Sequence, residues 1–337
     1  MATATLPTTL RPSFSFYMDS NDQRAIETYA AVADAVTLRG SGGPSAVIAL
    51  RRTDWSGCVL FDRAAYQHPE THIDAHSWFD EQLSAGADRL LTPGRWVDWT
   101  QNKGGFEAAV GAEFDLASGI DATVMLALDY RWLTKGHEIV AKVLRELRQP
   151  AAIALGSTGD PLAANGAVNG LISIVRQVPN LTILRADHGA IGATAFGASH
   201  ASIGLKPATR HAVPPGKKSF GKQNDRTARV FVWALADWFT AATIAGWSAA
   251  NVRLRCDLPC CSGASLDRFL DDGLKAAAAN HNRTTIVHFA DYILNAPEHD
   301  RVRLFAGLCQ NAVLQYEHLG PMAPEPKGQL SEWALWA

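Results

Sequence analysis

The sequence predicts an α/β protein: a (β/α)8 TIM barrel with a small C-terminal zinc-binding subdomain. Apolar strand-like runs alternate with segments of helical periodicity about eight times along the chain. Three of the five cysteines then lie within six positions, after this alternation has ended. A barrel of this kind needs about 250 residues. We therefore expect the barrel over 13–250 and the zinc-binding subdomain over 251–320, with a doubly wound open sheet as the alternative to the barrel.

The expected elements follow from the spacing of apolar residues and from the Gly and Pro residues between them. The predicted strands are 13–19, 46–50, 58–62, 88–92, 123–129, 151–155, 181–184 and 201–205. The predicted helices are 22–36, 76–85, 106–118, 137–148, 166–177, 190–198 and 230–245. A further apolar, strand-like run follows the cysteines at 284–289.

Composition places the chain among soluble globular proteins. Of its 337 residues 47% are hydrophobic and 19% are charged, and the net charge of −2 predicts no overall attraction to nucleic acid or membrane. No apolar run reaches the roughly 20 residues that span a bilayer. Residues 1–12 lack a basic segment followed by an apolar one, so they do not resemble a signal peptide. Five cysteines, three of them clustered, suit a metal site in a reducing compartment. We expect a cytoplasmic protein without membrane contact, as a monomer or a homo- or hetero-oligomer.

Acidic residues close several of the predicted strands. Asp19, Asp62 and Asp129 end strands, and Asp187 follows the strand 181–184. Barrel enzymes place their chemistry at the carboxyl ends of the strands, and neighbouring carboxylates divide acid and base roles between them. Asp62 and Asp187 are the predicted catalytic residues, and Asp129 is a predicted substrate-binding residue. The alternative is that these carboxylates cap helices or form turns.

The cysteine cluster has the chemistry of a zinc site. Three thiolates with one distant imidazole satisfy tetrahedral Zn²⁺, and a four-ligand site is closed and structural. The predicted ligands are Cys256, Cys260, Cys261 and His288. The alternative is that Cys260 and Cys261 are small core residues and His288 is a hydrogen-bonded core histidine.

The stretch 206–229 is the one strongly basic part of the chain. Its predicted nucleic-acid contacts are Lys206, Lys217, Lys218, Lys222 and Arg226. Lys and Arg neutralise phosphates, and Phe220 within this stretch has a ring on which a base can stack. The alternative is a solvated loop without a partner, because Pro214, Pro215 and Gly216 indicate an excursion of the chain.

Four short segments together resemble the tRNA-guanine transglycosylase superfamily. Cys256 and Cys261 keep the outer spacing of its Cys-x-Cys-x2-Cys zinc motif. The run 62–67 resembles its strand-end Asp-Ser-Gly-Gly-Phe-Gln, Asp129 resembles its second base-binding aspartate, and 207–210 resembles its Pro-Thr-Arg. The resemblance covers roughly 58–295. It implies a (β/α)8 barrel with a structural zinc that exchanges guanine for a 7-deazaguanine base in tRNA or DNA.

The resemblance also implies site residues and leaves one position unmatched. It makes Asp62 an acid/base or base-orienting residue and Arg210 a substrate contact, while His188 is a proton carrier, a phosphate contact or an ordinary surface histidine. The family's nucleophilic aspartate, four positions before the proline, falls on Ile203, whose apolar side chain cannot attack an anomeric carbon. Asp187 or Asp62 would then serve as nucleophile, or Asp62 would activate water.

Three functions remain open at this point. The first is a base-exchanging glycosyltransferase or N-glycoside hydrolase. The second is a non-catalytic partner subunit that binds nucleic acid. The third is an unrelated barrel hydrolase or lyase of a small molecule, which predicts metal at Asp or His residues of the barrel mouth instead of at the cysteines.

Overall fold

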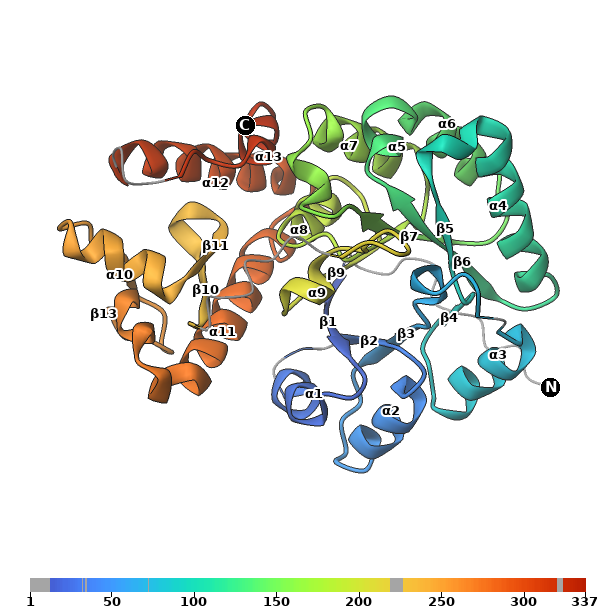
Figure 1. The fold of residues 1–337 in the computed structure, drawn as a ribbon, viewed down its shortest axis with the longest axis horizontal. Coiled ribbons are helices and arrows are strands. Elements are labelled where there is room, and N and C mark those ends of the chain that lie inside the picture. Colours follow the sequence, from blue (N-terminus) through green and yellow to red (C-terminus); the bar gives the residue numbers. More distant parts are fainter. Residues whose placement is uncertain (1–12, 32, 34, 72, 219–226, 320–323) are drawn as a thin grey trace.

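The computed structural model describes residues 13–31, 33, 35–71, 73–218, 227–319 and 324–337. Its main feature is one curled, all-parallel sheet, TIM-barrel-like in form (Figure 1). The strands are β1 (Ser13–Asp19), β2 (Ala35–Arg39), β3 (Cys58–Asp62), β4 (Leu90–Leu91), β5 (Arg95–Val97), β6 (Ala122–Asp129), β7 (Ala151–Gly156), β8 (Thr182–Leu184) and β9 (His200–Gly204). This confirms the predicted α/β class with a barrel-like sheet.

The strand order shows how the sheet curls. Hydrogen bonding runs β3-β2-β1-β9-β8-β7-β6-β4, and β5 also pairs with β6. β4 and β5 are therefore two pieces of one strand position, interrupted by the segment 92–94. An isolated parallel bridge between Leu60 and Arg89 brings the two ends of this order together. The carboxyl ends of all strands consequently meet at one face, called the mouth below.

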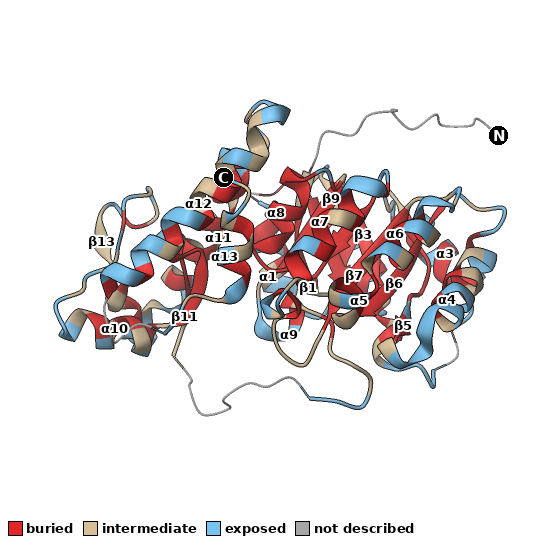
Figure 2. Ribbon diagram, turned by 90° about the horizontal axis from the view of Figure 1, so that it is seen from above, coloured by how far each residue is buried: buried red, intermediate tan, exposed pale blue. Residues whose placement is uncertain are grey.

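Helices follow the strands and cover the outside of the sheet (Figures 1 and 2). They are α1 (Gln23–Ala30), α2 (Gly43–Arg51), α3 (Ala75–Ser84), α4 (Asn102–Ala117), α5 (Arg131–Lys135), α6 (His137–Arg145), α7 (Ala167–Gln177), α8 (Gly189–Ala195) and α9 (Pro207–Arg210). One apolar core lies between strands and helices. A second, smaller core fills the inside of the sheet with small side chains such as Ala127, Ala152 and Ala154. Small residues there leave room for the large rings of Tyr66 and Trp96.

The remaining chain forms a C-terminal unit beside the β9 side of the sheet (Figure 1). It comprises β10 (Arg229–Val232), β11 (Asp237–Thr240), α10 (Ala241–Ala249), β12 (Arg255–Cys256), β13 (Ala264–Ser265), α11 (Lys275–Leu294), α12 (Glu298–Leu319) and α13 (Gly328–Ala334). The β10–β11 hairpin is fixed to α11, because Asn282 accepts from the amide of Phe231 and donates to the carbonyl of Arg229. α12 packs on α8, and α13 packs on α7. The bonds to Asn282 place the β10–β11 hairpin in the C-terminal unit, together with the cysteines.

Four element predictions are wrong. The run 46–50 is part of helix α2, and the true second strand, β2, lies inside and just beyond the predicted helix 22–36. The predicted helix 230–245 is the β10–β11 hairpin followed by the start of α10, and 284–289 belongs to helix α11. Short apolar runs carry no period that separates strand from helix, so packing decides between them. Every helix among the described residues is too short or too polar to cross a membrane.

Candidate functional site

A buried carboxylate lies at the centre of the mouth. Asp62, the last residue of β3, is fully buried and accepts three hydrogen bonds. The hydroxyl of Tyr17 donates to its Oδ2 over 2.5 Å, and the hydroxyl of Tyr66 donates to the same oxygen over 2.7 Å. The amide of Ala64 donates to Oδ1 over 2.7 Å. These donors hold the carboxylate in one orientation. Its place at the end of β3 is where the sequence predicts a site residue.

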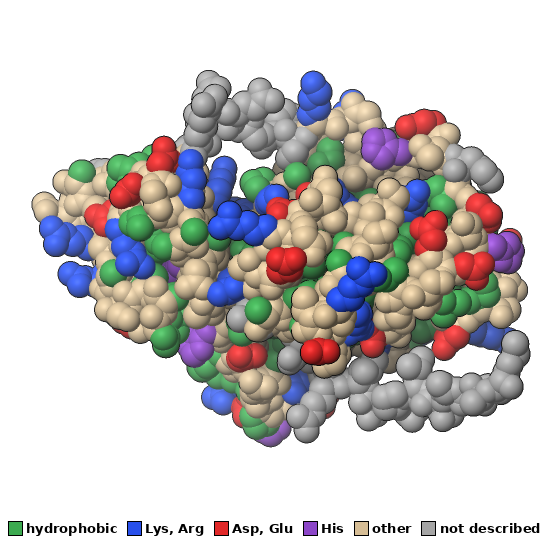
Figure 3. Space-filling model, turned by 90° about the horizontal axis from the view of Figure 1, so that it is seen from below, with side chains coloured by type: hydrophobic (Ala, Val, Ile, Leu, Met, Phe, Trp, Pro, Cys, Tyr) green, Lys and Arg blue, Asp and Glu red, His purple; other side chains and the backbone are tan. Residues whose placement is uncertain are grey.

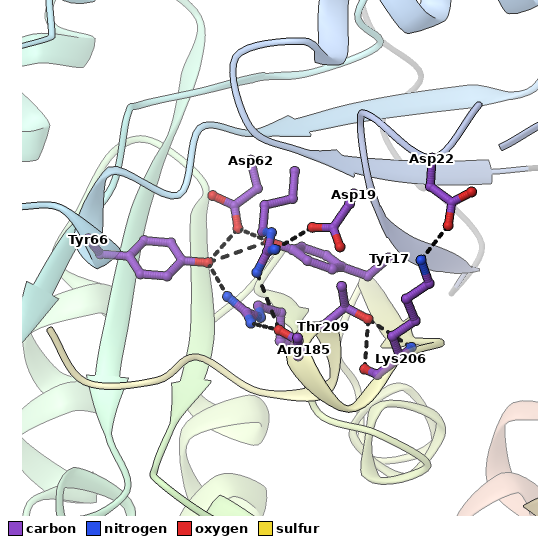
Figure 4. Close-up of polar contacts among 10 residues, drawn as sticks. Tyr17, Asp19, Asp22, Asp62, Tyr66, Arg185, Lys206 and Thr209 are labelled. Atoms are coloured by element: carbon purple, nitrogen blue, oxygen red, sulfur yellow. Dashed lines mark hydrogen bonds and ion pairs between the residues drawn. The ribbon is translucent and has the colours of Figure 1, made fainter. Parts of the chain in front are cut away.

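Arg185 completes this arrangement from the opposite side (Figure 4). It follows β8 with a positive φ of 60° and is fully buried. Its guanidinium donates to the hydroxyl of Tyr66 over 3.0 Å and to the carbonyl of Ala208 over 2.7 Å. Burial of the two tyrosines and the nearby charge of Asp62 raise both tyrosine pKa values, so both hydroxyls stay protonated. We call Tyr17, Asp62, Tyr66 and Arg185 the mouth network.

A pocket of about 600 Å³ opens next to the mouth network. It lies after the end of β3 and beside β5, and its lining residues include Tyr66 and Trp96 with Arg95, Gln101, Pro93 and Gly94. The ring of Trp96 also reaches Gly156 at the end of β7, where an added Cβ would lie 2.4 Å from it. We call this cavity the aromatic pocket. Its size is that of a pocket for a small organic ligand.

Asp129 is at the mouth but is fully engaged. The side chain of Arg131 donates to both of its carboxylate oxygens, over 2.8 and 2.7 Å. The backbone amide of Arg131 adds a third bond to Oδ1 at the start of α5. Asp129 therefore acts here as the partner of Arg131, as the turn-forming alternative predicts. The strand-end residue Asp19 instead pairs with Arg39 from β2 and is partly exposed.

Asp187 lies apart from the mouth network. Its carboxylate accepts from the indole of Trp238 in the β10–β11 hairpin over 2.7 Å. Burial disfavours its charge, but Arg210 and Lys327 outweigh that effect and lower its pKa. The guanidinium of Arg210 stacks on the ring of Trp238 at 3.6 Å. The predicted site residues Asp187 and Arg210 are thus brought together with each other, at the contact between the sheet and the C-terminal unit, and not with Asp62.

His188 belongs to the same buried contact. Both of its ring nitrogens are buried without a hydrogen-bond partner among the described residues. Burial lowers its pKa, so the imidazole is neutral there. It is not a surface histidine.

Ile203 faces the helices and not the inside of the sheet. It lines a small void together with Ile191 of α8, Ile286 and Phe289 of α11, and the Asp187–His188 pair. Its neighbours along β9 therefore point inward, and an aspartate at position 203 would not reach the mouth. Position 203 therefore cannot supply the nucleophile that the resemblance implies, both because its side chain is apolar and because it points away from the mouth.

The chain after β9 crosses the mouth. Ala212 donates to the carbonyl of Leu155 over 2.8 Å and accepts from the amide of Ser157 over 2.9 Å, so the segment passes β8 and joins β7. Lys206 pairs with Asp22, while Lys217 and Lys218 are exposed. Lys222, Arg226 and Phe220 lie outside the described residues.

The three clustered cysteines also lie together in the folded protein. The ligand atoms of Cys256, Cys260, Cys261 and His281 all lie within 4.8 Å of one another, so these four residues can hold a metal ion. The Sγ of Cys261 lies 3.3 Å from Nδ1 of His281. The prediction of His288 as a ligand is wrong. His288 lies exposed on α11, seven residues after His281, and this separation is about 10 Å along the helix axis.

Groups around the cluster orient its ligands. Nε2 of His281 lies 2.9 Å from the carbonyl of Phe231, which fixes the hydrogen on that nitrogen and leaves Nδ1 for the cluster. Arg268 donates to the sulfur of Cys261 over 3.1 Å. Burial and the neighbouring thiols raise the pKa of Cys260 to about 12. A divalent cation reverses such a shift, because it binds the thiolate form.

Comparisons with known proteins give no family. No family model matches the chain, and no curated protein matches it. Among solved structures, the chain is similar to a type I 3-dehydroquinate dehydratase from Clostridium difficile, with 13% identity over 63% of this chain and 92% of that one, at a TM-score of 0.38. It is also similar to a 3-dehydroquinate dehydratase from Aquifex aeolicus VF5, with 15% identity over 60% and 93%, at a TM-score of 0.36. These likenesses assign neither an activity nor a family.

Proposed function

We propose that the protein is a base-exchanging transglycosylase of the tRNA-guanine transglycosylase type, acting on a purine-like base in tRNA or DNA, with a closed (β/α)8 barrel as its scaffold. The observation that carries the proposal is Asp62, a buried strand-end carboxylate one hydrogen bond away from Tyr66, which lines the aromatic pocket. Planar bases stack on aromatic rings, and a carboxylate accepts the N–H groups of a purine edge.

The residues divide the work as follows. Tyr66 and Trp96 line the pocket that takes the base, and Gln101 offers an amide at the same pocket. Asp62 accepts an N–H of the base, and acts as the acid/base residue of the exchange, once a tyrosine hydroxyl has moved aside, since its oxygens already accept three bonds. Arg185 keeps the two tyrosines in place through Tyr66 and its own packing over the ring of Tyr17. Position 203 has no covalent role, because Ile203 faces the helices.

The metal that we assign to the cysteine cluster is Zn²⁺. Three sulfurs and one imidazole nitrogen form the Cys3His set of closed structural zinc sites. Such a site fixes α11 and the loop that carries the cysteines relative to the β10–β11 hairpin, through His281 and Phe231. Its role is therefore the shape of the C-terminal unit and not the chemistry.

The test is base exchange. The full-length, metal-loaded protein is incubated with radiolabelled guanine or a labelled 7-deazaguanine and either tRNA or double-stranded DNA, and label in the nucleic acid is counted. We expect incorporation with one of the two polymers. Asp62→Asn should reduce it by at least roughly 100-fold, the usual scale for removing a catalytic acid/base. Asp80→Asn, which changes an exposed carboxylate of α3, is the matched control. Failure of every base with both polymers contradicts the proposal.

A second candidate is a non-catalytic subunit that binds nucleic acid for a partner. Two observations favour it: the oxygens of Asp62 accept from donors of its own chain, and Ile203 faces away from the mouth. This candidate predicts salt-sensitive binding of tRNA or DNA without any exchange by the protein alone. Exchange that appears only after a catalytic partner is added would establish it.

A further inference from the structure

A second cavity, which we call the α1–α11 pocket, lies between the sheet and the C-terminal unit. Its volume is about 560 Å³, and its walls are α1, the end of β1, the segment 205–209 after β9, and the first turns of α11. Figure 3 shows Lys and Arg side chains around a hollow between the part of the surface formed by the sheet and its helices and the part formed by the C-terminal unit. A cavity of this volume accommodates one nucleotide.

The lining of the α1–α11 pocket carries an excess of positive charge. Four cations line it, Arg24, Lys206, Arg229 and Lys275, against two carboxylates, Asp19 and Asp22. Both carboxylates are already neutralised, Asp19 by Arg39 and Asp22 by Lys206.

Two of the four cations remain without an acidic partner. Lys275 pairs with Asp272 over 2.9 Å. Arg24 and Arg229 form no ion pair with any carboxylate of the described residues, and both are exposed. Both line the pocket, Arg24 from α1 and Arg229 from β10. Two unneutralised guanidinium groups at one cavity favour a ligand with phosphate oxygens.

The rest of the lining favours an organic phosphate over an inorganic ion. Met18, Tyr29, Leu205 and Pro207 give the pocket an apolar surface against which a sugar or base can pack. Its α11 wall is tied to α1, because Arg283 donates to the carbonyl of Thr28 over 2.6 Å.

Two further contacts place this pocket in relation to the rest of the site. Asn280 and Asn282 of this wall flank His281 of the metal cluster, so the metal site and the pocket share one helix. Tyr17 belongs to both this pocket and the mouth network, since its hydroxyl donates to Asp62.

We infer that the α1–α11 pocket binds a phosphate group of the nucleic-acid strand whose base is presented to the mouth, with Arg24 and Arg229 as the phosphate contacts. The inference rests on the proposed function only in naming nucleic acid as the source of the phosphate. Tyr17 lines this pocket, Tyr66 lines the aromatic pocket, and Asp62 accepts from both hydroxyls, so the two pockets flank the same buried carboxylate.

The experiment measures binding separately from exchange. Fluorescein-labelled tRNA and a labelled single-stranded oligonucleotide are titrated with full-length, metal-loaded protein between 50 and 300 mM salt, roughly the range in which phosphate contacts dominate. Arg24→Glu/Arg229→Glu is compared with Arg145→Glu/Arg148→Glu, which reverses two exposed arginines, the last residue of α6 and one three positions after it. Thermal unfolding of each variant confirms that it is folded.

We expect the first pair to weaken binding roughly tenfold or more and to lower the slope of log Kd against log salt by about two. The control pair should change neither by a comparable amount. Unlabelled guanosine 5′-monophosphate should compete and unlabelled guanosine should not, if the phosphate is what the pocket recognises.

Unchanged affinity and slope in folded Arg24→Glu/Arg229→Glu would overturn the inference, as would equal competition by guanosine. Absence of binding by both labelled nucleic acids would also overturn it, because nucleic acid would then not be the source of the phosphate. Exchange is scored in parallel: its absence, with binding lost in the variant, contradicts the proposed function but supports this pocket. Exchange by the Arg24→Glu/Arg229→Glu variant with an unchanged KM would support the proposed function and contradict the phosphate role of this pocket.

Discussion

Nδ1 of His281 lies 3.3 Å from the sulfur of Cys261, while His288 lies two helical turns further along the same helix. The two histidines are seven residues apart, so they share a helix face but differ by about 10 Å in height. Only the first can complete a four-ligand site with the three cysteines.

His281→Ala should therefore lose the metal, and His288→Ala should keep it. Removing a ligand costs at least the roughly 10–100-fold in affinity that an outer-shell partner costs. The measurement is metal content after dialysis against a weak chelator, with thermal unfolding of both variants. Equal retention of metal by the two variants would show that His281 is not a ligand.

The tyrosine donors of the mouth network should stabilise the fold as well as position Asp62. Tyr17→Phe and Tyr66→Phe each remove one hydrogen bond to a buried carboxylate, a loss of about 1.5–3 kcal/mol. Tyr292→Phe, at an exposed tyrosine of α11, should change the free energy of unfolding little. Urea unfolding measures all three. If the two network variants matched the control, the hydroxyls would not be bonded to Asp62 in solution.

Gly204 should tolerate no side chain. A Cβ there would lie 2.2 Å from the carbonyl oxygen of Thr209, which is backbone and cannot rotate away. Gly204→Ala should destabilise the protein by about 2–3 kcal/mol, the scale of overpacking a tight site, and should displace the segment 205–209.

Gly246→Ala is the matched control for Gly204→Ala. An added Cβ on Gly246 in α10 meets nothing within 4 Å, so this variant should be neutral or more stable by up to about 1 kcal/mol. Urea unfolding of both variants tests the pair, and a similar effect at the two glycines would refute the close approach at Gly204.

His200 should make stability depend on pH in the mildly acidic range. It is buried inside the sheet between the hydroxyls of Ser13 and Ser15, and burial, with a smaller effect of Arg89, lowers its pKa to about 3. The unfolded chain binds a proton near pH 6.5, whereas the folded one does not until about pH 3. The stability that neutral His200 contributes is thus present above pH 6.5 and is lost as the pH falls below it.

Between pH 6.5 and 4.5 this group alone lowers the free energy of unfolding by about 1.4 kcal/mol per pH unit. His200→Gln keeps a polar group between the serines and should reduce that slope by one proton. Urea unfolding at a series of pH values measures the slope. An unchanged slope in the variant would mean that His200 is already charged in the folded protein.

The barrel-like sheet was predictable because its long buried strands are continuous apolar runs ending at acidic residues. The strand Ala122–Asp129 is buried along its whole length, and Asp62 ends its strand where predicted. The sequence does not single out the second strand, Ala35–Arg39, because Val36 also continues the helical spacing of Ile26, Tyr29 and Ala33. Local spacing cannot decide between helix and strand here, whereas the pairing of this segment with β1 and β3 makes it a strand.

The site was predictable in part. Asp62 and the three cysteines carry signals in the sequence, a strand-end carboxylate and a cluster of soft ligands. Tyr17 and Arg185 carry none, because their role arises only when β1 and β8 meet Asp62 across the inside of the sheet. The sequence does not single out His281, since it stands before the apolar run 284–289 that contains His288.

By itself the sequence determined which chemical groups are available and roughly where strands end, because apolar runs, carboxylates and clustered cysteines are local properties of the chain. The tertiary structure alone decided which of these groups meet. Asp187 and Arg210 face the C-terminal hairpin, Ile203 faces the helices, and Asp62 faces two tyrosines. The physical reason is that the direction of a side chain at a strand end depends on sheet register and on the packing around it. A shift of one residue turns it to the other face.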